Sequence, residues 1–186
     1  MFGGTFDPIH NAHLEIARAA ADRFVPEKVL FIPAASPTHK RAGPIVGYTD
    51  RVRMAELACA GEARFEVSRI EEGFARSYSI LTIEKLLSVL RGSFGFLIGA
   101  DAFAEIRTWH RWTDVVRLVD FIVVTRPGAV YDVPRGARVH ELAGLELPES
   151  SSDIRARIAR GDAGVPLPPP VLAYIHEHRL YQSRKP

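Results

Sequence analysis

The chain has 186 residues, of which 47% are hydrophobic, and a formal net charge of +2 at an isoelectric point of about 8.9. We expect a single domain over 1–186, with a small helical C-terminal part from about residue 150. The balanced charge argues against nucleic-acid binding, and no apolar run reaches the roughly 18 residues of a membrane span. With no signal peptide and Cys59 as its only cysteine, the chain is expected in the cytoplasm.

Short apolar runs alternate with amphipathic stretches along the chain. Phe2 closes a first short strand, and further strands are predicted over 29–32, 65–67, 94–98 and 121–124 and around Val139. Helices are predicted from residue 11 or 12 to 24, over 50–60 and 79–91, from about Ser152, and from Pro170 to about 178. This alternation is typical of βα units, so we predict an α/β fold: a Rossmann-like, doubly wound parallel sheet with flanking helices.

The first thirteen residues, MFGGTFDPIHNAH, form a glycine-rich junction between strand and helix. Gly3 and Gly4 let a ligand approach the backbone, and a helix N-terminus favours anions. His10 and His13 are three residues apart and lie on one face of a first helical turn. Two alternatives are a metal site, which needs a third ligand, and a structural role as capping or core residues. The pattern favours a phosphate site that handles a nucleoside triphosphate.

A second anion-binding pattern lies far downstream, in residues 150–155, SSSDIR. Hydroxyl groups suited to capping and free amides stand at a helix N-terminus, and Arg155 follows one turn later. A plain capped surface helix is the alternative. Local basic clusters here and at residues 40–41 suit a small anionic ligand better than a long phosphate backbone.

Several segments resemble known signatures. Residues 3–13 resemble G-G-T-F-D-P-x-H-x-G-H of the H-x-G-H nucleotidyltransferase superfamily, with Ala12 in place of glycine. Residues 150–155 resemble its I-S-S-T-x-x-R element, after a Glu149 that replaces an apolar residue. Other segments are similar to the bacterial nicotinate-nucleotide adenylyltransferase family: IPAASPTHK at 32–40 (where Ala34 and Ala35 replace small polar residues), SYS at 77–79, IGAD at 98–101, WHRW at 109–112, TRPG at 125–128, and parts of 167–181.

The resemblance implies an adenylyltransferase of NAD biosynthesis. ATP and nicotinate mononucleotide would give nicotinate adenine dinucleotide and pyrophosphate, by direct in-line attack at the α-phosphate without a protein nucleophile. His10, His13 and Arg155 would be catalytic. ATP would be bound by Gly3, Gly4, Thr5, Phe6, His39, Lys40, Gly99, Asp101, Ser151 and Ser152. Mg²⁺ would arrive with ATP, because the sequence suggests no carboxylate cluster that would form a metal site.

The acceptor nucleotide would be bound by five residues: Tyr78, Ser79, Trp109, Trp112 and Arg126. Trp109 would stack on the pyridine ring, and backbone amides near Ser79 and Trp112 would bind its carboxylate. For Trp109 the alternative is a purely structural aromatic residue. Asp101 would bind the ribose of ATP, and its alternative is a helix N-cap.

Two other functions stay open. The acceptor could be nicotinamide mononucleotide or phosphopantetheine, or the chain could be a non-catalytic nucleotide-binding module. Neither nucleic acid nor a membrane is an expected partner, and a homo-oligomer is left open.

Overall fold

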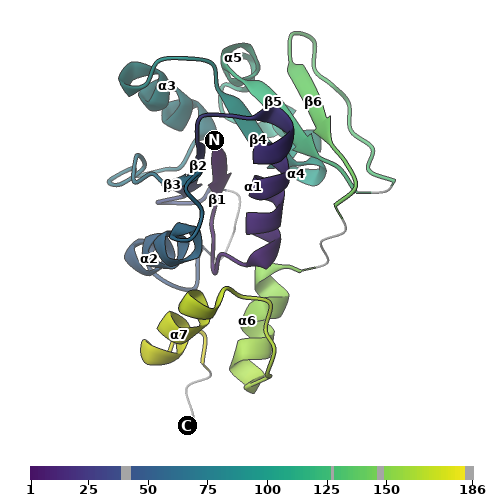
Figure 1. The fold of residues 1–186 in the computed structure, drawn as a ribbon. Helices are drawn as coiled ribbons and strands as arrows, with labels where there is room; N and C mark the ends of the chain where they lie inside the picture. Colours follow the sequence, from purple (N-terminus) through teal and green to yellow (C-terminus); the bar gives the residue numbers. More distant parts are fainter. Residues whose placement is uncertain (39–42, 127, 146–148, 183–186) are drawn as a thin grey trace.

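The computed structural model describes residues 1–38, 43–126, 128–145 and 149–182 (Figure 1). Their strands form a six-stranded sheet in the order β3-β2-β1-β4-β5-β6, and every pair is parallel. The strands are β1 (Phe2–Gly4), β2 (Val29–Pro33), β3 (Phe65–Val67), β4 (Gly95–Gly99), β5 (Asp120–Val124) and β6 (Arg138–Leu142). This order is that of a doubly wound sheet, so the predicted fold class is confirmed.

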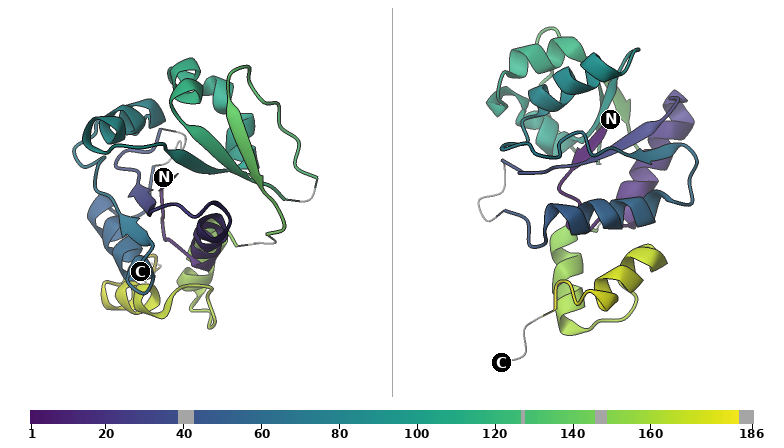
Figure 2. Two further views of the ribbon diagram at one scale, coloured as in Figure 1. Left: turned by 45° about the horizontal axis from the view of Figure 1, so that its top comes forward. Right: turned by 90° about the vertical axis from the view of Figure 1, so that its left-hand side faces the viewer.

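Helices cover both faces of the sheet (Figure 2). They are α1 (Asn11–Phe24), α2 (Tyr48–Cys59), α3 (Ser79–Val89), α4 (Ala100–Ala104), η1 (Ile106–Thr108, a 3₁₀ helix), α5 (Trp112–Leu118), α6 (Ser151–Arg160) and α7 (Pro169–Glu177). Because side chains alternate along a strand, Leu97 of β4 packs in the core with α1 and α2, whereas Phe96 and Ile98 pack with α3, α4 and α5.

The structure differs from the predicted elements between residues 79 and 118. The helix expected over 79–91 ends at Val89, and β4 includes Gly99. Residues 100–118 hold α4, η1 and α5, which the sequence did not indicate. These helices have five, three and seven residues, too few for a repeating apolar pattern to be visible.

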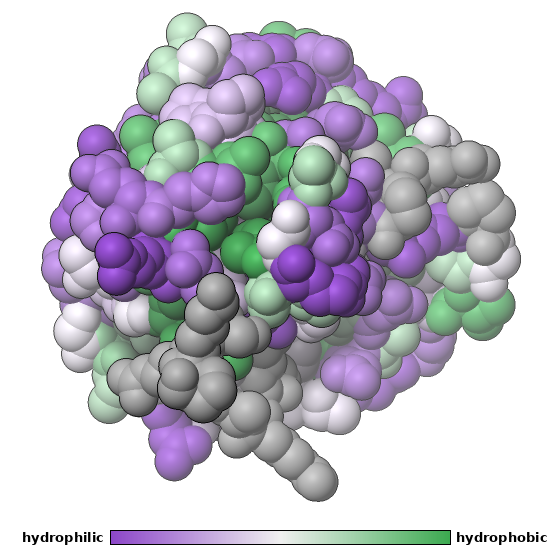
Figure 3. Space-filling model, turned by 90° about the horizontal axis from the view of Figure 1, so that it is seen from below, coloured by the Kyte–Doolittle hydropathy of each residue, from purple (hydrophilic) through white to green (hydrophobic). Residues whose placement is uncertain are grey.

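The C-terminal helices α6 and α7 lie beyond one end of the sheet, where the space-filling view shows mostly hydrophilic side chains around an apolar hollow (Figure 3). Ser150 caps α6 by accepting a hydrogen bond from the Asp153 amide at 3.1 Å. Tyr174 of α7 donates to Asp50 of α2 at 2.9 Å. The contact between Tyr174 and Asp50 thereby fixes the C-terminal part to α2, which packs beside β2 and β3.

Cys59 is buried, and burial raises the pKa of its thiol to about 12, which makes it an inert core residue. Among the helices of the described ranges, none is long and apolar enough to cross a membrane.

Candidate active site

The candidate site lies at the carboxyl ends of β1 and β4. These strands are neighbours in the sheet, but α1 after β1 and α4 after β4 pack on opposite faces. In an open α/β sheet, such a reversal leaves a crevice in which ligands bind. The loop from Gly4 to His10 lies on one side of this crevice, and the turn at Gly99 lies on the other.

Gly3 and Gly4, the first two glycines of the chain, differ in why glycine suits the position. A Cβ on Gly4 would lie 2.8 Å from the Phe6 ring, so packing alone requires glycine there. Phe6 is 2% exposed and has a φ of 49°, a left-handed conformation that few bulky residues adopt. A Cβ on Gly3 would meet nothing closer than 3.9 Å. Gly3 is therefore free of this packing constraint, and its exposed backbone is open to close approach by a ligand.

The two histidine rings lie in contact, with their centroids 3.8 Å apart and their planes tilted by 41°. His13 accepts a hydrogen bond from the His10 amide through Nδ1 at 3.2 Å, so its ring proton is on Nε2. His10 is only 4% exposed, and burial lowers its pKa to about 4. Both rings thus suit hydrogen bonding to phosphate as neutral donors, without a second positive charge in the site.

The structure bears on both alternatives for the histidine pair. His10 is the N-cap of α1 and the His13 ring accepts from its amide, so a capping role is present and is compatible with a ligand role. Buried Nδ1 of His10 has no hydrogen-bond partner among the residues described, so this ring is not satisfied by the protein. Within 1–38, 43–126, 128–145 and 149–182, no group of three or more His, Cys, Asp or Glu side chains is placed to hold a metal ion. An unsatisfied polar atom beside an anion-binding loop favours a ligand.

The second motif lies directly against the first. Ser151 donates from Oγ to the Pro8 carbonyl at 3.1 Å. Arg155 donates from Nη1 to the Asp7 carbonyl at 2.7 Å, and from Nη2 to Ser152 Oγ at 3.2 Å. The structure therefore joins two motifs almost 150 residues apart, as a triphosphate site requires. Ala12 is buried in α1, so its methyl group adds little to the crevice, and nothing in the structure explains Glu149.

Asp101 lies where the predicted ribose contact would be. Its carboxylate is exposed in the first turn of α4, just after the carboxyl end of β4. Gly99 holds the N-cap position, so the alternative of Asp101 as the helix cap is wrong. His39 and Lys40, the other predicted phosphate ligands, lie outside the described residues.

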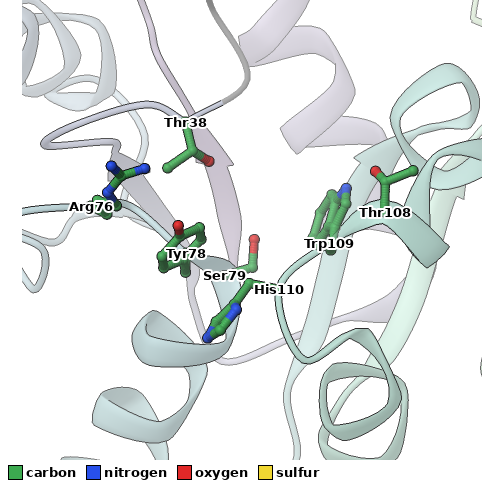
Figure 4. A pocket seen from close by; sticks show the side chains of 7 residues that line it. All are labelled: Thr38, Arg76, Tyr78, Ser79, Thr108, Trp109 and His110. Atoms are coloured by element: carbon green, nitrogen blue, oxygen red, sulfur yellow. The ribbon is translucent and has the colours of Figure 1, made fainter.

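A cavity of about 260 Å³ lies beside the crevice (Figure 4). It is lined by Thr38, Arg76, Tyr78, Ser79, Thr108, Trp109 and His110. These residues follow β2, β3 and β4 in the chain, so the cavity shares the carboxyl edge of the sheet with the histidines. Small-molecule sites typically have roughly 300–1,000 Å³, so this cavity suits one end of a nucleotide.

Three of the five predicted acceptor residues line this cavity. Trp109 packs on Phe96, with ring centroids 5.8 Å apart, and also lines the cavity, so a structural role and the predicted binding role are compatible. Trp112 is partly buried against the core at the start of α5, and its amide donates to the Trp109 carbonyl at 3.2 Å. Arg126 is exposed after β5. Neither of the last two lines the cavity, and their binding roles stay predictions.

Four cavity residues were missed from the sequence: Thr38, Arg76, Thr108 and His110. Thr38 and His110 lie inside segments that carry the family resemblance, and Arg76 and Thr108 directly precede two such segments, so this adjacency was the available signal. Figure 4 shows Arg76 and Tyr78 on one side of the space and Trp109 on the other. Arg76 brings positive charge, and its guanidinium makes no hydrogen bond or ion pair with another described residue. The cavity combines aromatic faces with a cation, which suits an aromatic acid.

Comparisons with known proteins agree with this geometry. Residues 1–157 match the family model "Cytidylyltransferase-like". The chain is 60% identical over 183 residues to a protein of Solibacter usitatus named probable nicotinate-nucleotide adenylyltransferase, with 97% of each chain covered. A protein of the same name from Exiguobacterium sibiricum is 39% identical over 186 residues, with 98% of each covered.

Solved structures share the fold. The Plasmodium falciparum nicotinic acid mononucleotide adenylyltransferase in complex with NaAD superposes with a TM-score of 0.81 at 16% identity, over 97% of this chain and 95% of that one. The same enzyme in complex with APC gives a TM-score of 0.77 at 18% identity, over 97% and 94% of the two chains. The sequence similarity, which extends over almost the whole length, shows that the chain belongs to the nicotinate-nucleotide adenylyltransferase family, within the cytidylyltransferase-like proteins.

Proposed function

We propose that this protein transfers the adenylyl group of ATP to nicotinate mononucleotide, forming nicotinate adenine dinucleotide and pyrophosphate in NAD biosynthesis. One observation carries the proposal: a histidine-bearing phosphate loop and a cation-lined aromatic cavity share the carboxyl edge of one sheet. The names of the relatives, at up to 60% identity among those compared, support the same activity.

The reaction needs positioning more than covalent chemistry by the protein. A phosphate oxygen of nicotinate mononucleotide attacks the α-phosphorus of ATP as the bond to the β-phosphate bridging oxygen breaks, and pyrophosphate leaves in line. Nε2–H of His13 would donate to an α-phosphate oxygen and stabilise the charge that develops there. His10 lies beside it and would bind the same phosphate region.

The triphosphate would lie between the loop and the start of α6. Backbone amides of residues 3–6 and of Ser151 and Ser152 would bind phosphate oxygens, with Arg155 supplying positive charge. Lys40 and His39 would hold the β- and γ-phosphates, a role that rests on the sequence motif. Asp101 would accept hydrogen bonds from the ribose, and Gly99 would let the adenosine approach β4. ATP would enter as its magnesium complex, with the phosphate oxygens as ligands of the ion.

The pyridine end of the acceptor would occupy the cavity. Trp109 offers an aromatic face, and the start of α3 offers the Ser79 amide and hydroxyl to the carboxylate (Figure 4). Arg76 adds a positive charge that favours an acid over an amide. Tyr78 would complete the wall opposite Trp109, while Trp112 and Arg126 would act from outside the cavity lining.

A pyrophosphate-release assay tests the proposal directly. Purified protein, ATP and Mg²⁺ would be incubated with nicotinate mononucleotide, nicotinamide mononucleotide or phosphopantetheine in parallel. We expect the largest kcat/KM with nicotinate mononucleotide. A preference for one of the other acceptors would assign the chain a different substrate, and no release with any of them would indicate a nucleotide-binding module.

A further inference from the structure

Asp7 is a buried acid in the phosphate loop that the proposed reaction does not use. Its side chain is 2% exposed, and both carboxylate oxygens accept hydrogen bonds. Oδ2 accepts from the Ile45 amide at 2.7 Å, and Oδ1 accepts from the hydroxyl group of Tyr181 at 2.7 Å. Tyr181 lies 174 residues away in sequence and is itself buried. The C-terminal segment therefore reaches into the phosphate loop.

The same loop is held from other directions. Arg51 of α2 is fully buried and donates from Nη1 to the Thr5 carbonyl at 2.7 Å. Arg155 of α6 donates to the Asp7 carbonyl. Between these points, Phe6 keeps its left-handed backbone conformation, which persists only where the surroundings impose it. The loop conformation thus depends on contacts from outside the loop.

We propose that Tyr181 is a positioning residue that, through Asp7, fixes the loop carrying His10 for reaction at the α-phosphate. The inference rests on the proposed function. In-line transfer requires near-contact geometry, and a displacement of about 1 Å can lower the rate by two orders of magnitude. A single buried hydrogen bond to the loop can thereby influence turnover without contact to either substrate.

The chemistry of Tyr181 suits this role. Burial and the neighbouring Asp7 carboxylate raise the pKa of the phenol, so the hydroxyl keeps its proton and remains a donor. The substitution Tyr181→Phe keeps the ring and its packing but leaves Oδ1 of Asp7 without its partner in a buried place, which is costly. The carboxylate would then seek another donor or water, and the loop would shift with it.

The chain offers a matched control in Tyr174. It lies in the same C-terminal part and donates to an aspartate, Asp50 of α2, at 2.9 Å. Asp50 lies outside the phosphate loop. The substitution Tyr174→Phe therefore removes one tyrosine–aspartate hydrogen bond from the same segment while leaving the loop contacts in place.

The experiment compares both variants with the wild type by steady-state kinetics, thermal unfolding and hydrogen exchange of the amides of residues 4–13. For Tyr181→Phe we expect kcat to fall about tenfold, KM for ATP to change by less than about twofold, and loop amides to exchange about tenfold faster. For Tyr174→Phe we expect all three values within about twofold of wild type.

Equal kcat and equal loop exchange in the two variants would overturn the proposal, since Tyr181 would then only stabilise the fold. Equal melting temperatures with different kcat and loop exchange would support it. If the wild type forms no nicotinate adenine dinucleotide, the proposed function fails, and the exchange data alone still decide whether Tyr181 holds the loop.

Discussion

The phosphate loop and the acceptor cavity share one edge of the sheet but are built in opposite ways. Loop residues such as Phe6, Asp7 and His10 are buried, and side chains from α2, α6 and the C-terminal segment bind the loop. Cavity residues such as Arg76 and His110 are exposed. These buried contacts preorganise the loop for chemistry, whereas the cavity side chains lie at the surface.

The largest expected effect comes from the loop. His13→Ala removes the Nε2–H donor to the α-phosphate, and we expect kcat to fall by about 10²–10³-fold, the usual loss for one transition-state donor. Pyrophosphate release at saturating substrates is the measurement. The control is His176→Ala, an exposed histidine of α7, which should leave kcat unchanged. Near-normal turnover of His13→Ala would remove His13 from the mechanism.

Burial of His10 makes the stability of the folded protein sensitive to acid. The pKa of His10 is about 4 in the folded protein, against 6.5 as the ordinary value. Between pH 6.5 and pH 4 the unfolded chain binds a proton on His10 that the folded protein does not bind. The free energy of unfolding therefore falls as the pH drops from 6.5 to 4, by up to about 3 kcal/mol. Urea unfolding of the wild type and His10→Asn across this range measures the difference. An identical pH dependence in both would show that His10 is not buried as a neutral ring.

Trp109→Ala tests whether the acceptor cavity and the phosphate loop bind their substrates independently. Losing the stacking face should raise KM for nicotinate mononucleotide by about tenfold, since an aromatic pair contributes about 0.5–1.5 kcal/mol beyond burial. KM for ATP should stay within about twofold. Initial rates with each substrate varied in turn give both constants. Equal increases for ATP and acceptor would assign Trp109 a structural role.

The smallest effect is expected at the rim of the cavity. Arg76→Ala should lower the preference for nicotinate over nicotinamide mononucleotide by about fivefold, because an exposed charge pair contributes about 1 kcal/mol or less. The ratio of kcat/KM values for the two acceptors is the measurement. Arg91→Ala removes another exposed arginine, outside the cavity, and should leave the ratio unchanged. An unchanged ratio in Arg76→Ala would show that acid selection lies elsewhere.

The sequence predicted the parts of the molecule that are local. Strand β2 and helix α1 were visible as an apolar run and as a 3.6-residue pattern, and the loop between β1 and α1 has a specific motif. The short helices of 100–118 were missed because five or seven residues carry no periodicity. Their position decides where Trp109 and His110 lie, so the sequence indicated Trp109 but not the cavity around it.

Contacts between distant segments could not be predicted in the same way. The Arg155 motif was recognised, but its contact with Asp7 depends on how α6 packs against the loop. Tyr181 and Arg51 carry no motif spacing relative to Thr5 or Asp7, and only the folded chain brings them together. Buried polar partners of this kind are set by tertiary structure, and a one-dimensional pattern gives no signal for them.

The central claim is that the preorganised loop supports direct in-line transfer, with no covalent adenylyl–protein intermediate. The most direct test is the stereochemical course at phosphorus, using ATP made chiral by sulfur at the α-phosphate and nicotinate mononucleotide as acceptor. One in-line displacement predicts inversion of configuration in the dinucleotide product. Retention would require two displacements through a protein nucleophile and would contradict the account.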